Sequence, residues 1–210
     1  MAADASSSSE QSLGETLGLR GPAIVWGRVL AFFLAWMLCG IPSVLFFMLR
    51  GGSRVSPSYW ALEFFTSLLF VALVVISFRN IRGDVGAVVV ASIAYTLLVP
   101  WLQLLNRPVS GLGSLAVPSV AALNLGPLFV LLGLALSLRG LRPRWLALWV
   151  GSLAGFVVSY LFSILLAASY LARTRPAFAH LSLSAENLAA DIVTATAFTL
   201  IFELLSSVLD

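Results

Sequence analysis

Six apolar stretches, each long enough to cross a bilayer, constrain this chain more than any other feature. A transmembrane α-helix needs about 20 predominantly apolar residues. Stretches of that length lie at residues 23–49, 59–78, 85–105, 115–138, 145–171 and 184–209, and short segments with arginine, glycine or proline separate them. We therefore expect an all-α polytopic membrane protein, with a six-helix transmembrane bundle over residues 23–210 and a flexible, serine-rich tail over residues 1–22.

Every basic residue of the chain is an arginine, and the arginines divide unevenly between the two sides of the predicted bundle. Seven lie on the side of the N-terminus (20, 28, 79, 82, 139, 142 and 144) and five lie on the other (50, 54, 107, 173 and 175). The positive-inside rule then predicts that both termini are cytoplasmic, in a bacterial inner membrane. Because the arginines are scattered through short loops, we expect no direct nucleic-acid binding.

The last apolar stretch carries polar residues that need partners within the membrane. Glu186, Asp191 and Glu203 lie on different faces of a helix with 100° per residue, so they do not form one site on that helix. One stripe must face other helices or a wet cavity, and it contains Thr196, Thr199, Glu203 and Ser206. Arg28 of the first stretch lies at the same depth as Glu203, so the two either pair or each reach the interface alone.

Two segments of the chain match residue by residue with two later segments, which is a pattern that an internal duplication would leave. Residues 57–63 align with residues 118–124, and residues 77–82 align with residues 137–142. A duplication predicts two copies of one helical hairpin, whereas the alternative is a chance match between apolar segments. Glu63 and Asn124 take equivalent places in the two copies. They either line a shared cavity or form interhelical hydrogen bonds.

Small residues and one proline indicate how the fourth and fifth predicted helices pack. Gly126-Pro127 lies at the middle of the fourth, where proline predicts a kink; the kink is either structural or part of a transport site. Gly151, Gly155, Ser159 and Ser163 recur at every fourth position of the fifth helix. This spacing is typical of helices that approach closely.

The chain lacks the residue patterns of known catalytic and metal centres. Its single cysteine, Cys39, and single histidine, His180, predict an ordinary buried thiol and an ordinary loop side chain. Asp84 lies in a predicted loop without an acidic partner. We therefore expect no enzyme, no metal and no cofactor. Two functions remain: a regulator that works through protein contacts, and a solute permease or solute-binding subunit whose path is lined by Glu63, Asn124, Asp191 and Glu203.

The layout of the whole chain resembles the membrane-bound anti-sigma factors that control carotenogenesis in myxobacteria. The resemblance rests on a cytoplasmic tail, six crossings and a lysine-free, arginine-only composition. It implies a transcription regulator of carotenoid biosynthesis that holds a sigma factor at the inner membrane until light releases it. Under this resemblance the tail contacts the partner, and Glu10, Glu15 and Arg20 become the candidate binding residues.

Overall fold

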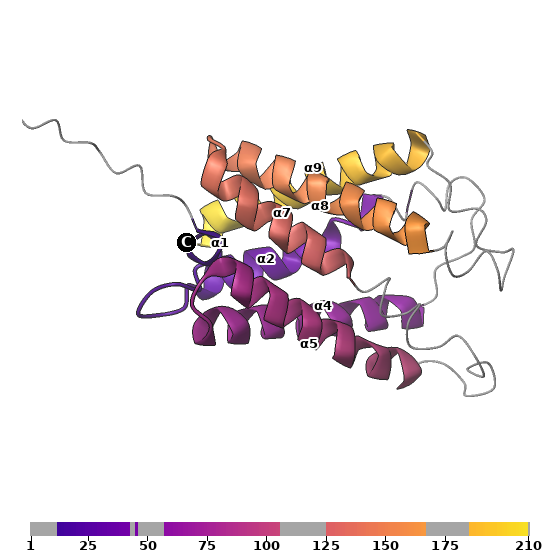
Figure 1. The fold of residues 1–210 in the computed structure, drawn as a ribbon, viewed down its shortest axis with the longest axis horizontal. Helices are drawn as coiled ribbons and strands as arrows, with labels where there is room; N and C mark the ends of the chain where they lie inside the picture. The colour runs from indigo at the N-terminus through magenta and orange to yellow at the C-terminus, as the bar shows by residue number, and fades with distance from the viewer. Residues whose placement is uncertain (1–11, 43–44, 46–56, 106–124, 167–184, 210) are drawn as a thin grey trace, which may run out of the picture.

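The computed structural model describes residues 12–42, 45, 57–105, 125–166 and 185–209, which fold into helices without any strand (Figure 1). The short helix α1 (Leu13–Thr16) precedes six longer helices. These are α2 (Trp26–Leu38), α4 (Pro57–Asn80), α5 (Asp84–Leu105), α7 (Gly126–Gly140), α8 (Arg144–Leu166) and α9 (Ala185–Leu209). The predicted all-α class is therefore confirmed.

The six longer helices pack in a ring that follows the order of the chain. Each contacts the next, from α2 through α4, α5, α7 and α8 to α9, and α2 closes the ring against α9. The ring of Phe32 in α2 lies 6.2 Å from those of Phe70 in α4 and Phe198 in α9, centroid to centroid. All three side chains are at most 1% exposed. An aromatic cluster therefore holds α2 between the first hairpin and the last helix.

The outer surface of the ring is also apolar. Among the described side chains, five leucines are more than 60% exposed: Leu97, Leu136, Leu165, Leu200 and Leu204. An apolar exterior of this kind is typical of a surface that contacts lipid rather than water. Three segments are long and apolar enough to span a membrane, namely Glu63–Asn80, Arg144–Phe162 and Leu188–Leu209. Together these features indicate membrane association.

Two of the other apolar helices, α2 and α7, are shorter in the described residues than the sequence predicted, whereas α5 spans Asp84–Leu105, close to the predicted 85–105. Helix α2 ends at Leu38, where a turn at Cys39 and Gly40 follows, and α7 begins only at Gly126. Pro127 consequently lies in the first turn of α7, where its missing N–H costs no helical hydrogen bond. The predicted mid-helix kink at Pro127 is therefore wrong for the helix that the structure describes.

The α4–α5 and α7–α8 hairpins share a pattern of burial and turn geometry. Val74 and Leu134 are buried at equivalent positions of the first helices, and Ala87 and Ala147 are buried in the second helices. In both turns an N–H donates to the carbonyl oxygen of the serine four residues earlier, at 2.8 Å. The two hairpins therefore share these features, and the duplication itself stays a prediction. Asn124 lies outside the described residues, so its equivalence to Glu63 stays a prediction.

Glycines allow α7 and α8 to approach each other closely. A Cβ atom on Gly155 would collide with the Cα atom of Val130, and one on Gly151 would lie 2.7 Å from the carbonyl oxygen of Gly133. Ser159, one turn further along α8, lies beside Gly126. The small-residue stripe therefore mediates a close helix contact, as predicted, and the structure identifies the partner as α7. Of the four residues of this stripe, Ser163 alone has a side chain that the structure does not describe.

Candidate functional site

One end of the bundle collects α1, both hairpin turns and the C-terminal part of α9 (Figure 1). We call this the terminal end, and it comprises residues 12–25, 79–84, 139–144 and 203–209. The first residues of α2 also belong here, because a Cβ atom on Gly27 would collide with the carbonyl of Leu209. The beginning of α2 and the end of α9 are therefore in contact at the terminal end.

The N-terminal segment is folded onto the terminal end rather than flexible. Leu13, Leu17 and Leu19 are at most 2% exposed. Ser12 caps α1, because its hydroxyl accepts the N–H of Glu15 while the Glu15 carboxylate accepts the N–H of Ser12. The predicted flexible tail is therefore wrong for residues 12–22. The prediction followed the polar composition of the segment and overlooked three leucines whose spacing lets them be buried together. Glu10 lies outside the described residues.

Asp84 fastens this segment to the first hairpin. It is the first residue of α5 and is 3% exposed, and its Oδ2 atom accepts the N–H of Leu13 at 2.6 Å. Its Oδ1 atom lies 3.8 Å from a guanidinium nitrogen of Arg20, which also lies over the ring of Phe78. The prediction that Asp84 lies in a loop is therefore wrong, because it begins a helix. An acidic residue directly after Gly83 was the signal for a helix start.

These contacts change the role of two predicted partner-binding residues. Arg20 already binds Asp84, and Glu15 caps α1 with its carboxylate and accepts Arg28 on its carbonyl oxygen at 3.3 Å. Arg79 binds the same segment by donating to the carbonyl oxygen of Gly21 at 2.9 Å. In the described structure, Glu15 and Arg20 therefore hold the N-terminal segment on the bundle.

Arg144 fastens α9 to the second hairpin. It is the first residue of α8, and its Nε atom donates to a carboxylate oxygen of Glu203 at 2.9 Å. A second nitrogen of the same guanidinium donates to the hydroxyl of Ser206 at 3.1 Å. The expected partner of Glu203 was Arg28, which lies at a matching depth but binds Glu15 instead. Depth along a helix does not reveal which neighbour a side chain faces.

The polar stripe of α9 faces another helix, which is one of the two predicted outcomes, and the structure identifies that helix as α8. Two turns above the Arg144 contact, the indole N–H of Trp149 donates to the hydroxyl of Thr196 at 3.0 Å. Thr199 lies between these contacts, is 5% exposed, and donates to the carbonyl oxygen of Ala195. The stripe therefore joins α9 to α8 through the side chains of Thr196, Glu203 and Ser206.

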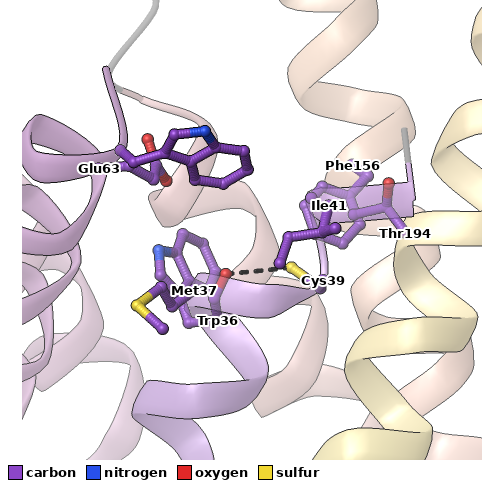
Figure 2. A pocket seen from close by; sticks show the side chains of 9 residues that line it. Trp36, Met37, Cys39, Ile41, Glu63, Phe156 and Thr194 are labelled. Atoms are coloured by element: carbon purple, nitrogen blue, oxygen red, sulfur yellow. Dashed lines mark hydrogen bonds between the residues drawn. The ribbon is translucent and has the colours of Figure 1, made fainter. Parts of the chain in front are cut away.

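A cavity of about 190 Å³ lies in the half of the bundle away from the terminal end. Its walls come from the end of α2, the beginning of α4, and the middle parts of α8 and α9 (Figure 2). The lining residues are Trp36, Met37, Cys39, Gly40, Ile41, Trp60, Glu63, Phe156 and Thr194. Glu63 is therefore the one ionisable carboxylate on a wall that is otherwise largely apolar and aromatic.

The remaining candidates lie apart from this cavity or outside the described residues. Asp191 lies on α9, one turn before Thr194, but is not part of the cavity wall, and its buried Oδ2 atom has no hydrogen-bond partner. Cys39 is buried and its thiol donates to the carbonyl oxygen of Trp36 at 3.2 Å, as an ordinary buried cysteine does. Asn124 and His180 lie outside the described residues. The structure therefore brings Glu63 to a cavity without Asp191 or Glu203.

Within the described ranges, no three histidine, cysteine or acidic side chains gather as a metal site would require. No family model matches the chain, and comparisons with curated proteins and with solved structures likewise found no similar protein. The contacts described above are therefore the basis for any proposal about function.

Proposed function

We propose that this chain is a non-enzymatic, multi-pass protein of a bacterial inner membrane that binds a cytoplasmic protein at its terminal end. The observation that carries the proposal is a set of exposed arginines in the two hairpin turns, beside the N-terminal segment and the end of α9. These arginines are Arg79, Arg82, Arg139 and Arg142. A surface of this charge favours a partner with an acidic patch.

The charge of the terminal end supports a cytoplasmic position. Together with Arg28 of α2, this end contains all seven arginines that the sequence assigns to the side of the N-terminus. Its described carboxylates are Glu15, Asp84 and Glu203, so positive charge is in excess. Trp26 and Trp145 are 65% and 56% exposed at the same end, as suits side chains at a membrane interface. With six crossings, both termini are then cytoplasmic.

Because the N-terminal segment is folded, we place the contact with the cytoplasmic partner on the two hairpin turns rather than on a flexible tail. Arg20 and Glu15 are engaged within the protein, whereas the side chains of Arg82 and Arg139 are exposed. A membrane-bound anti-sigma factor, which the resemblance implied, would use such a surface to retain a sigma factor at the membrane. In that case its partner is a sigma factor, and its targets include genes for carotenoid biosynthesis.

An affinity capture from mild detergent tests this proposal. The full chain should retain a soluble partner in a fixed ratio, and Arg82→Gln/Arg139→Gln should lose at least about tenfold of that capture. Arg107→Gln/Arg173→Gln is the matched control, because it removes two arginines that the sequence assigns to the opposite side. Equal capture by both double variants, or no soluble partner at all, would overturn the proposal.

A solute permease or solute-binding subunit is the second candidate, and the Glu63 cavity favours it. The two candidates make opposite predictions for one pair of variants. A permease loses function when Glu63 becomes Gln and keeps it when Arg82 and Arg139 become Gln. A regulator of a cytoplasmic partner shows the reverse pattern in the same assay of cellular phenotype.

A further inference from the structure

The cavity beside Glu63 has three features that each favour a positive charge. The first is the Glu63 carboxylate, which is part of the wall and half-buried. Among the described residues, no arginine lines the cavity. A carboxylate in an apolar wall is stabilised strongly by a bound cation, because little water competes for it.

The second feature is aromatic. Trp36, Trp60 and Phe156 come from three different helices and line the same cavity. Aromatic faces carry partial negative charge and attract organic cations, with tryptophan the strongest. In Figure 2, Glu63 and Trp36 lie on one side of the cavity, and Ile41, Phe156 and Thr194 lie on the other. A ligand between these sides would meet both a carboxylate and aromatic rings.

The third feature is the C-terminal end of α2. Trp36, Met37, Cys39, Gly40 and Ile41 line the cavity around the point where α2 ends, at Leu38. The C-terminus of a helix carries partial negative charge from its unpaired carbonyl groups, and this charge favours a nearby cation. Carboxylate, aromatic rings and helix end therefore act in the same direction.

The size and lining of the cavity distinguish organic from inorganic cations. Its volume of about 190 Å³ exceeds the roughly 150 Å³ of an engineered apolar cavity that binds benzene. Hard metal cations require a shell of oxygen ligands. Among its side chains this wall offers only one carboxylate and one hydroxyl, that of Thr194; the other lining side chains are aliphatic, aromatic or sulfur-containing. The lining therefore suits a cation whose charge is surrounded by methyl or methylene groups.

We propose that the Glu63 cavity binds a small organic cation, an alkylammonium compound about the size of choline. Glu63 neutralises the charge, and Trp36, Trp60 and Phe156 contact the alkyl groups. The site lies away from the terminal end, with about 25 Å of α4 between Glu63 and Asn80. The inference therefore goes beyond protein binding at the terminal end and stands whether or not that function is correct.

Binding of choline to the purified full chain in detergent tests the proposal. Titration calorimetry should detect choline and should show at least about tenfold weaker binding of 3,3-dimethylbutan-1-ol, its neutral carbon isostere. Tryptophan fluorescence should change on the same titration, because Trp36 and Trp60 line the cavity. Equal binding of the neutral isostere, or no choline binding by the wild type, would contradict the proposal.

Substitutions locate the site. Glu63→Gln should lower choline affinity at least about tenfold and leave the weak binding of the neutral isostere unchanged. Glu186→Gln is the matched control, because Glu186 is an exposed carboxylate in the first turn of α9 and does not line the cavity. Size-exclusion chromatography confirms that each variant is folded. Unchanged choline affinity in folded Glu63→Gln places the cation elsewhere and rejects the proposal.

Discussion

Asp84 and Arg144 are the first residues of α5 and α8, and each forms an ion pair with another segment of the chain. Asp84 supplies the negative charge of its pair, whereas Arg144 supplies the positive charge of its pair. Asp84 binds Leu13 and Arg20 of the N-terminal segment, and Arg144 binds Glu203 and Ser206 of α9. Both positions follow the turn of a hairpin, and the two turns have the same hydrogen bond. One position in two similar hairpins therefore attaches two different elements, and its charge selects which element it attaches.

Replacing Asp84 should release the N-terminal segment. Asp84→Ala leaves the buried N–H of Leu13 without an acceptor and removes the counter-charge of Arg20, at a cost of about 1–3 kcal/mol. Trypsin should then cleave after Arg20 several times faster than in the wild type. Arg82→Gln, in the neighbouring turn, is the control and should leave that rate unchanged. Equal cleavage of Asp84→Ala and wild type would show that Asp84 does not hold the segment.

Residues 1–11 and residues 12–22 should contribute differently to the stability of the fold. Deletion of residues 1–11 removes none of the described contacts and should change the melting temperature by less than about 2 °C. Deletion of residues 1–22 removes Leu13, Leu17 and Leu19 from the core and should lower it measurably. Differential scanning fluorimetry in detergent measures both. Identical melting temperatures for the two deletions would restore the prediction of a flexible tail.

Glu203 should be coupled to Arg144 and not to Arg28. The side chains of Arg144 and Glu203 are 27% and 33% exposed, so their coupling free energy should be only about 0.5–1 kcal/mol. A double-mutant cycle with Arg144→Ala and Glu203→Ala measures it from free energies of unfolding. The cycle of Arg28→Ala with Glu203→Ala is the control and should be additive. Coupling in the second cycle but not the first would support the original pairing of Glu203 with Arg28.

A larger side chain at Gly155 should disrupt the close packing of α7 on α8. Gly155→Leu introduces atoms where the backbone of Val130 lies and should cost about 3 kcal/mol or more. Ala154→Leu is the matched control, since its neighbouring position is exposed on the outer surface. The yield of monodisperse protein and its melting temperature compare the two. A stable Gly155→Leu variant would mean that α7 and α8 are farther apart than described.

The orientation of the chain should follow its arginines. Reporter fusions after Asp210 should show activity typical of the cytoplasm, and fusions within residues 173–180 should show activity typical of the periplasm. Arg82→Glu/Arg139→Glu reduces the charge difference that sets this orientation and should give mixed labelling. A periplasmic reporter signal after Asp210 in the wild type would contradict both the orientation and the proposed cytoplasmic partner.

The class of the fold followed from the sequence alone, because apolar stretches of membrane length leave helices as the main way to satisfy backbone hydrogen bonds in lipid. Periodicity also predicted the glycine stripe of α8 and the polar stripe of α9, since both depend on positions within one helix. Only the tertiary structure decided which helices these stripes face. It paired Glu203 with Arg144, buried Asp84 and folded residues 12–22 onto the bundle. Each of these depends on the rotation of one helix about its axis relative to another, which packing of the whole ring determines and spacing along one chain segment does not.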